Sequence, residues 1–333
     1  ENRLLSLTFT SRGGALKEVA FKEYPITQGA SEPYRMVAPE ETPFLSLTHP
    51  EKLNAVDLSN YVLVEQTENK IVFAAKLSPT LGLIREYTLT SPEEKRTAQG
   101  YLLEQKLTWV NSGATAMEFP SYAQNIAIAA PTDSDPQHTF LNFGRYDGKE
   151  AKFTTMHEFQ GGGFLFWSSP AKDKVEVPSP VLWATVKNHF FTAILTPEKG
   201  AIGAVTTPYD LADNKKGVAG YLKFASVRVE AQSQVSASST VYFGPKEYAR
   251  LASLGTKQEE VMQWGWPIFA FFSQLFISML NAIAHAVKNY GLAIVALTLI
   301  IRAVMWPFTA AASAASKKMA SIQPVLAELK KKY

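Results

Sequence analysis

The first 250 residues are built from short runs in which apolar and polar positions alternate, and turn-forming residues separate these runs. Alternation with a period of two places one face of a β-strand in a core and the other in solvent. Residues 3–10 follow this pattern, and Gly13 and Gly14 give the backbone freedom for a reversal before residues 15–24 return as a second strand. The same pattern predicts strands over 70–77, 83–90, 101–110, 181–195, 221–231 and 235–243. So many short strands predict a mainly β fold, a large antiparallel β-sandwich.

The pattern changes after residue 263, where charged residues become rare. Within residues 268–287 the polar positions recur at steps of three and four, which is the spacing of one face of an α-helix. That face comprises Gln274, Ser278, Asn281, His285 and Lys288, opposite Phe269, Phe272, Phe276, Leu280, Ile283 and Val287. We predict an amphipathic helix that lies along a membrane surface, with Trp264 and Trp266 as anchors at the level of the lipid headgroups. The alternative is a helix whose apolar face packs on the protein's own core.

The next segment, residues 291–308, is apolar on all sides except for Arg302, and it approaches the roughly 20 residues that a helix needs to cross a bilayer. At about 1.5 Å per residue, Arg302 lies about 18 Å from Tyr290 and about 22 Å from Lys317 if the helix runs through Pro307. This places the arginine near the middle of a hydrocarbon core about 30 Å thick. An unpaired charge at that depth is costly, so we predict that Arg302 faces a water-filled cavity or a partner. The alternative is an arginine that snorkels to the interface.

The charge of the chain is unevenly distributed, although its formal total is only +3. Residues 251–333 contain eight Lys or Arg and three acids, which is a charge of +5 and leaves −2 for the rest. Lys317 and Lys318 follow the apolar segment and would anchor its end at the interface, and three further lysines follow near the C-terminus. The positive-inside rule therefore predicts a cytoplasmic tail and a β-domain on the opposite side. In the tail, Pro324 is expected to open a new helix.

These patterns predict five successive parts of the chain. They are a β-sandwich domain over residues 1–250, a linker over 251–263, an amphipathic surface helix over 264–289, a transmembrane helix over 290–312 and the start of a cytoplasmic helical arm over 313–333. The cations gather on the apolar tail and not on the folded domain, which argues against a nucleic-acid binder.

Candidate chemistry is sparse, and we predict no catalytic residue, metal site or cofactor. The chain has no cysteine, which excludes disulfides, thiolate metal sites and cysteine nucleophiles. No P-loop, dinucleotide-binding or nucleophile-elbow motif is present. The nearest acid–base pairing is the adjacent His157 and Glu158, which we interpret as two ordinary surface groups. Asp133 and Asp135 lack the ligand spacing of a calcium loop and are expected in a solvated turn.

Several segments resemble the bacterial YidC membrane protein insertases of the YidC/Oxa/Alb group. The most specific matches are residues 298–309, 318–319 and 322–324, and weaker ones are residues 11–14, 24–25 and 241–247. The first group, which contains Arg302, is similar to the family's first core transmembrane helix and the start of its cytoplasmic helical hairpin. Residues 264–289 correspond to the family's amphipathic helix at the periplasmic surface.

The resemblance implies a periplasmic β-supersandwich, similar in fold to sugar mutarotases, joined to an insertase core in the bacterial inner membrane. In that family a hydrophilic groove within the membrane carries one positive charge, which Arg302 matches, and this charge receives the polar part of an incoming membrane segment. The implied partners are nascent membrane proteins, membrane lipid, the Sec translocon and the ribosome. Residues 1–289 would be periplasmic. The family's core has five transmembrane helices and an N-terminal anchor helix, so the resemblance also implies that this chain is a piece of a longer protein.

Two alternatives stay open. The first is a membrane-anchored periplasmic enzyme or carbohydrate-binding domain of the mutarotase kind, which would need an acid–base pair in a cleft. The second concerns topology: residues 268–287 and 291–308 could form a transmembrane hairpin, which would leave the β-domain and the tail on the same side of the membrane.

Overall fold

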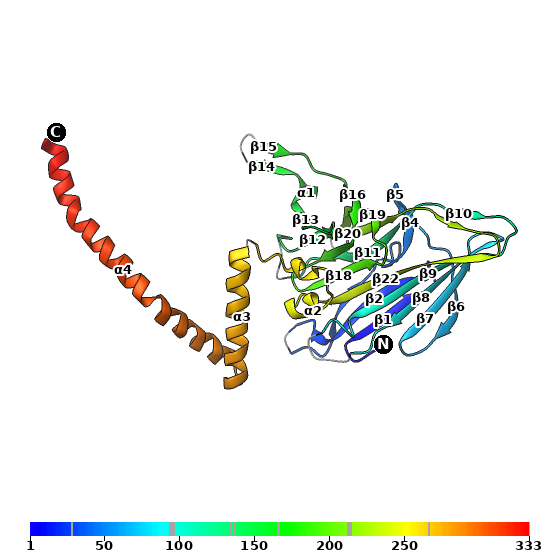
Figure 1. The fold of residues 1–333 in the computed structure, drawn as a ribbon, viewed down its shortest axis with the longest axis horizontal. Coiled ribbons are helices and arrows are strands. Elements are labelled where there is room, and N and C mark those ends of the chain that lie inside the picture. The colour runs from blue at the N-terminus through cyan, green and yellow to red at the C-terminus, as the bar shows by residue number, and fades with distance from the viewer. Residues whose placement is uncertain are drawn as a thin grey trace. The chain divides into compact units, whose positions relative to one another are not determined.

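The computed structural model describes residues 1–27, 29–92, 97–133, 135, 137–164, 167–211, 215–265 and 267–332. The chain divides into two compact units, Glu1–Met262 and Gln263–Tyr333, each of which has its own internal contacts (Figure 1). The first unit is a β-sandwich and the second consists of two helices.

The larger sheet of the first unit has nine strands, and all neighbouring strands in it are antiparallel. In spatial order they are β13 (Ala151–Thr155), β12 (Asn142–Tyr146), β17 (Trp183–Lys187), β18 (Phe191–Pro197), β22 (Ser233–Pro245), β9 (Leu102–Asn111), β8 (Leu81–Leu89), β7 (Lys70–Lys76) and β6 (Val62–Gln66). The period-two pattern of the sequence explains these strands. β8, for example, buries every second residue from Leu81 to Leu89, because alternate side chains face the core.

The smaller sheet packs against part of the larger one and closes the core. Its six strands in spatial order are β16 (Val175–Val181), β19 (Ala201–Asp210), β20 (Lys216–Phe224), β11 (Tyr122–Ala129), β4 (Leu47–His49) and β5 (Lys52–Val56). β11 is buried along its whole length, and both β11 and β20 contact β17 of the larger sheet. Trp109, Trp183 and Phe143 are fully buried in the resulting core. The predicted antiparallel sandwich is confirmed.

Short elements surround the two sheets. They are the three-stranded sheet of β1 (Leu5–Thr10), β2 (Ala15–Pro25) and β3 (Pro33–Val37), the pairs β10 (Met117–Phe119) with β21 (Val227–Val229) and β14 (Gly162–Phe164) with β15 (Trp167–Ser169), and the short helix α1 (His157–Gln160).

The predicted hairpin at the start of the chain is confirmed, and its turn explains two glycines. β1 pairs with β2, and Gly13 and Gly14 have φ angles of 69° and 54°, which side chains with a Cβ rarely adopt. A Cβ on Gly13 would also meet the carbonyl oxygen of Asp57 at 2.5 Å. The buried guanidinium of Arg85 donates to the carbonyl oxygen of Gly13, so the turn is fixed to β8.

Two predicted strands were wrong because the chain turns inside them. The range 181–195 contains two strands, since the Asn188 side chain accepts hydrogen bonds from the amides of Phe190 (3.1 Å) and Phe191 (2.9 Å) and closes a turn between β17 and β18. The range 221–231 breaks after Phe224, because the following short strand β21 leaves β20 and pairs with β10.

The segment expected as a linker, 251–263, packs on the sandwich at both of its short helices. It contains most of helix α2 (Tyr248–Ala252) and the 3-10 helix η2 (Gln258–Met262), and the side chains of Leu251 and Val261 are fully buried. The first unit therefore extends to Met262 and not to residue 250. Burial of these two apolar side chains explains why the segment does not behave as a free connector.

The second unit consists of α3 (Pro267–Val287) and α4 (Tyr290–Lys332). Between them, Lys288 has a φ angle of 56°, which ends α3, and the Asn289 side chain caps α4 by accepting a hydrogen bond from the amide of Leu292 at 3.2 Å.

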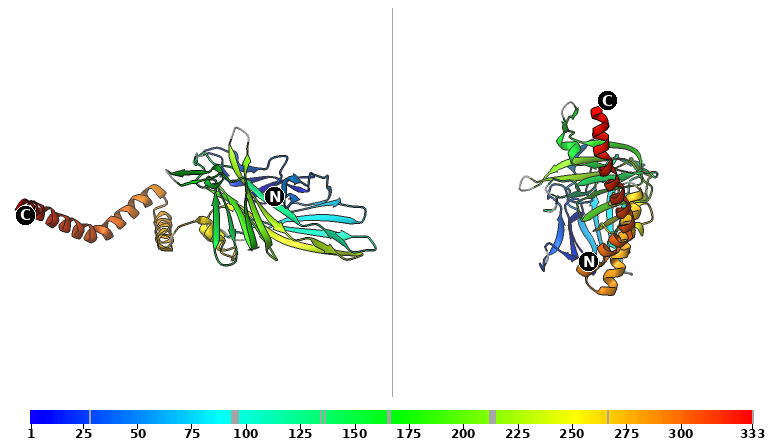
Figure 2. Two further views of the ribbon diagram at one scale, coloured as in Figure 1. Left: turned by 90° about the horizontal axis from the view of Figure 1, so that it is seen from above. Right: turned by 90° about the vertical axis from the view of Figure 1, so that its left-hand side faces the viewer.

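α4 continues through Pro324, so the predicted new helix at that proline was wrong. α4 also continues past residue 312, where the transmembrane part was expected to end, and it bends along its length (Figure 2). Pro307 lies inside it and removes one backbone hydrogen bond.

Candidate functional site

Among the described residues, one helical stretch is long and apolar enough to cross a membrane, and it is Tyr290–Lys317 within α4. Its 28 residues extend about 42 Å at about 1.5 Å per residue, which exceeds a hydrocarbon core of about 30 Å. Because α4 is unbroken at Pro307, Arg302 lies about 18 Å from Tyr290 and about 22 Å from the end of this stretch. The charge is therefore far from both ends of the apolar helix.

Within residues 291–316 of α4 the polar side chains share one face, a feature that the sequence prediction missed. At about 100° per residue, a sector about 60° wide holds Thr298, Arg302, Thr309, Ser313 and Ser316. The hydroxyl groups of Thr298 and Thr309 donate to helix carbonyls at 2.7 and 2.9 Å, so their protons are already used. The Arg302 side chain is exposed and forms no ion pair or hydrogen bond with the described residues. The spacing of four, seven, four and three residues could have revealed this face.

α3 has a large exposed apolar surface. Phe269, Phe272 and Phe276 are 63%, 45% and 37% exposed. On the polar face of the helix, the Asn281 side chain accepts a hydrogen bond of 3.4 Å from the hydroxyl of Tyr290 at the start of α4. The amphipathic pattern is thus present in α3, while its position on a membrane surface stays a prediction.

Three of the four predicted interface anchors, Trp264, Lys317 and Lys318, lie within the described residues. Trp264 is half-buried and lies three residues before the start of α3, whereas Trp266 lies outside the described residues. Lys317 is exposed and ends the stretch that could span a membrane. Lys318 continues α4, and its side chain is not described. Their contact with lipid headgroups stays a prediction.

The enzyme alternative needs an acid–base pair in a cleft, and the pair that the sequence offered lies on a short helix. His157 and Glu158 lie on α1, and the Glu158 carboxylate pairs with Lys172 at 3.0 Å. In the part of the chain that the structure describes, no group of three His, Asp or Glu side chains is placed to hold a metal ion. The expectation for Asp135 was wrong, because its carboxylate is buried and accepts the amide hydrogens of Thr139 and Phe140, both at 2.8 Å. Asp133, by contrast, has a fully exposed side chain.

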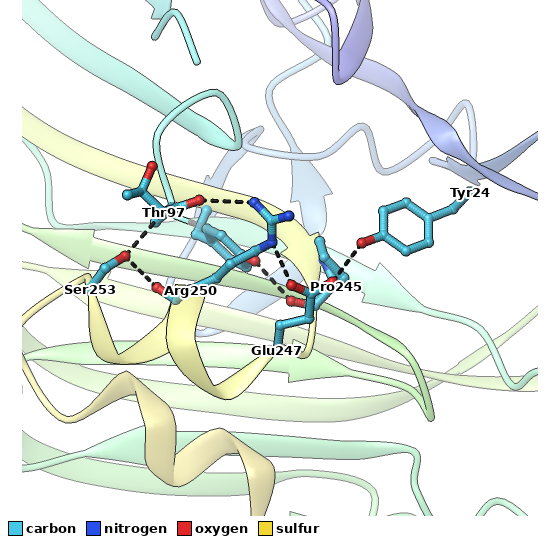
Figure 3. A network of polar contacts seen from close by, with 8 residues as sticks. Tyr24, Thr97, Pro245, Glu247, Arg250 and Ser253 are labelled. Carbon is cyan, nitrogen blue, oxygen red and sulfur yellow. Dashed lines mark hydrogen bonds and ion pairs between the residues drawn. The ribbon is translucent and has the colours of Figure 1, made fainter. Parts of the chain in front are cut away.

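A polar network joins the last strand of the sandwich, helix α2 and the first hairpin (Figure 3). The Glu247 carboxylate accepts hydrogen bonds from the Tyr24 hydroxyl and from Nε of Arg250, both at 2.7 Å. Arg250 also donates to the carbonyl oxygen of Thr97 at 3.0 Å, and Tyr242 donates to that of Pro245 at 2.8 Å. Two weak motifs of the sequence, residues 24–25 and 241–247, therefore meet at one place.

A second set of contacts holds the segment that precedes helix α3 in the chain. Nζ of Lys187 donates to the carbonyl oxygen of Val261 at 2.7 Å, and Nε1 of Trp183 donates to that of Thr256 at 2.7 Å. Sequence patterns could not reveal these bonds, because both acceptors are backbone atoms more than 70 residues away along the chain.

Comparison with known families agrees with these features. Residues 1–279 match the family described as "YidC periplasmic domain", and residues 282–333 match the family described as "60Kd inner membrane protein". Together the two matches cover both units of the chain.

Curated relatives include proteins named "Membrane protein insertase YidC". The protein from Chlorobaculum tepidum is 25% identical over all of this chain, and that from Chlorobium limicola is 24% identical over the same extent. A relative from Parabacteroides distasonis is 22% identical. The chain spans 56% of the length of each of the first two relatives and 52% of the third, which is about half of these proteins.

Solved structures similar to the first unit include a galactose mutarotase related enzyme from Lactobacillus acidophilus. That structure has a TM-score of 0.47 and 12% identity, and the match covers 73% of this chain and 95% of the enzyme. A putative aldose 1-epimerase from Escherichia coli K12 has a TM-score of 0.42 and 8% identity, with 74% of this chain and 97% of that one covered.

Proposed function

Since the chain belongs to the YidC family, we propose that it is part of a membrane protein insertase and chaperone that inserts and helps to fold inner-membrane proteins. The observation that carries this proposal is the position of Arg302, a single charge deep inside an apolar helix on the same face as small hydroxyl side chains. The proposed substrates are nascent membrane proteins.

The physical reason concerns the energy of a charge in the membrane. A lone arginine in hydrocarbon is costly, and hydration of the surrounding surface lowers that cost. We propose that the face of Thr298, Arg302 and Thr309 lines a hydrophilic groove within the membrane. There the guanidinium would attract the acidic or polar part of an incoming segment, which would then enter the bilayer before it moves sideways into lipid.

The remaining parts of the proposal concern partners and location. The first unit and helix α3, which together fall within residues 1–289, would lie on the periplasmic side, and the lysine-rich end of α4 would lie in the cytoplasm. Membrane lipid, the Sec translocon and the ribosome are the proposed partners of the whole insertase. The proposed activity makes and breaks no covalent bond, and it needs no cofactor or metal.

The test replaces Arg302 in the whole insertase that contains these residues. We expect Arg302→Ala to reduce insertion of substrates whose translocated segment carries acidic residues by about ten-fold, since it removes one charge-assisted contact. Arg302→Lys keeps the positive charge and should retain more activity. Insertion is measured for several substrates by protease protection of their translocated segments in membrane vesicles.

The matched control is Thr309→Ala, which removes a hydroxyl from the same face and leaves the charge. Equal insertion of acidic substrates by the wild type and by Arg302→Ala would show that this charge has no role in insertion. A loss that is the same for acidic and neutral translocated segments would contradict electrostatic attraction as the mechanism.

A further inference from the structure

A pocket of about 670 Å³ lies at the end of the sandwich that contains the Tyr24–Glu247 contact. Residues 24–27, 34, 131–133, 189–191 and 245–247 line it, and we call it the Lys246 pocket. Its walls come from the ends of β2, β18 and β22, next to the network of Figure 3. None of these residues belongs to the membrane helices.

Five of the fourteen residues that line the Lys246 pocket have aromatic rings, and they are Tyr24, Tyr34, His189, Phe190 and Phe191. Phe190 and Ile26 are 50% and 57% exposed, although both are large apolar side chains. His189 is stacked between the rings of Phe140 and Phe190, at centroid distances of 4.1 and 4.3 Å. Such walls favour a flat or bulky apolar group, because its burial would remove these surfaces from water.

Three charged side chains line the pocket, and two of them are neutralised by neighbours. The Glu247 carboxylate binds Nε of Arg250 at 2.7 Å, and the Asp133 carboxylate lies 3.6 Å from Nζ of Lys215. The third, Lys246, forms no ion pair or side-chain hydrogen bond within the described part of the chain. Its ammonium lies over the ring of Phe140, with Nζ 5.9 Å from the centroid.

The environment of Lys246 leaves its charge poorly compensated. Burial lowers the pKa of Lys246 to about 8, and the carboxylate of Asp135 opposes this effect. That carboxylate accepts two amide hydrogens from its own loop, from Thr139 and Phe140, and it makes no ion pair with Lys246. A carboxylate that entered the pocket would therefore supply the counter-charge that the fold does not provide.

We propose that the Lys246 pocket binds an extended peptide segment in which an acidic residue lies next to an aromatic or large aliphatic residue. The carboxylate pairs with Lys246, and the apolar side chain packs on Phe190 and Ile26. Thr27 interrupts the apolar wall, so a lipid chain would cover a polar group there, whereas a peptide backbone offers it a hydrogen bond. Binding at this pocket is independent of Arg302.

The experiment uses the whole chain in detergent micelles and a short peptide with the sequence Gly-Phe-Asp-benzoylphenylalanine-Gly, acetylated and amidated at its ends. Irradiation cross-links the benzophenone to its neighbours, and mass spectrometry of protease digests locates the products. A second peptide has Asn in place of Asp. Lys246→Met removes the charge and keeps an apolar stem, and Lys52→Met removes an exposed lysine elsewhere on the sandwich as the matched control.

We expect cross-links within residues 24–27, 131–133, 189–191 and 245–247, and about ten-fold less product with the Asn peptide or with Lys246→Met. The control should match the wild type, and the circular dichroism of all variants should be unchanged. If Lys246→Met does not fold, Phe190→Ala on the exposed wall is the second variant, and it should also reduce labelling.

Three results would overturn the proposal. They are equal labelling by the Asp and Asn peptides, cross-links that map outside the pocket, and displacement of the peptide by monomeric oleate but not by an unlabelled copy of the peptide. The last result would assign the pocket to a lipid carboxylate. None of these results bears on insertion by Arg302, so the two proposals fail separately.

Discussion

Lys187 is the residue whose burial has the clearest consequence for stability. Its side chain is 2% exposed, and Nζ lies 4.7 Å from the centroid of the Phe153 ring while it donates to Val261. Burial, with a smaller contribution from Lys246, lowers the pKa of Lys187 to about 6. The amine is therefore held largely neutral at pH 7.5, unlike an exposed lysine.

This pKa predicts a pH dependence of folding. Between about pH 6 and pH 10 the unfolded chain binds a proton at Lys187 that the folded chain does not, so the free energy of unfolding should rise with pH in this window. We expect Lys187→Met to flatten this rise between pH 6 and pH 9, a range that stops below the ionisation of exposed tyrosines. Urea denaturation of residues 1–262 at several pH values measures it.

Lys52→Met, which changes an exposed lysine, is the control and should keep the slope of the wild type. A Lys187→Met variant with the same slope as the wild type would show that the Lys187 amine is protonated in the folded state. The loss of the hydrogen bond to Val261 lowers stability by about 1 kcal/mol at every pH and leaves the slope unaffected.

Single residues also show where sequence reasoning stops. Arg302 could be singled out from the sequence, because a charge in an apolar run is visible without a structure. Lys187, Lys246 and Arg85 could not, because their environment depends on strands far away in the chain. Whether a charged side chain is buried depends on which strands pack around it, and the sequence does not reveal the order of the strands in the sheets.

At the scale of elements, the segment of α2 and η2 is held to the sandwich by buried side chains and by hydrogen bonds. Its polar contacts reach Trp183 and Lys187 on β17 and Ala151 on β13, whose amide donates to the Glu260 carboxylate at 3.1 Å. The sequence analysis predicted a linker over residues 251–263, which contains most of this segment. Its two buried apolar residues give too weak a periodicity to reveal the packing.

We predict that this segment resists proteolysis and that its polar bonds are the reason. Trypsin should cleave after Lys257 slowly in the wild type, and about ten-fold faster when Trp183→Phe and Lys187→Met together remove the hydrogen bonds to Thr256 and Val261. Gel electrophoresis of timed digests measures the rate. Equally fast cleavage of the wild type would mean that the segment opens freely, and Lys52→Met serves again as the control.

The strands and helices themselves were largely predictable. Alternation predicted β1, β2, β7, β8, β9 and β22, because each has one face in the core. One wrong strand prediction, residues 181–195, missed a turn that the Asn188 side chain closes inside an apolar run. The wrong prediction of a new helix at Pro324 arose because α4 accommodates this proline without a break. Helical spacing of polar residues predicted α3. The polar residues around Arg302 in α4 have the same kind of spacing, so this face could have been predicted from the sequence as well.

At the scale of the whole molecule, the chain contains a β-sandwich unit and a second unit with a long apolar helix. This helix carries one charge, Arg302, far from the ends of its apolar stretch, and it has a basic C-terminal end. The uneven charge, −2 for residues 1–250 and +5 for the rest, predicts the orientation of these two parts across a membrane. The order of strands in the sheets and the meeting of Tyr24 with Glu247 could not be predicted, because pairing over more than 200 residues leaves no local pattern.

The orientation of the chain in the membrane tests the central claim most directly, since Arg302 can serve insertion only if α4 crosses the bilayer. The chain has no cysteine, so Ser233→Cys in the sandwich unit and Ser321→Cys in α4 each give a single labelling site. A membrane-impermeant maleimide is applied to spheroplasts and to inverted inner-membrane vesicles. We predict that the cysteine at 233 reacts only in spheroplasts and the cysteine at 321 only in inverted vesicles. Reaction of both from the same side would mean that α3 and α4 form a transmembrane hairpin or that neither crosses, and either result would contradict the account.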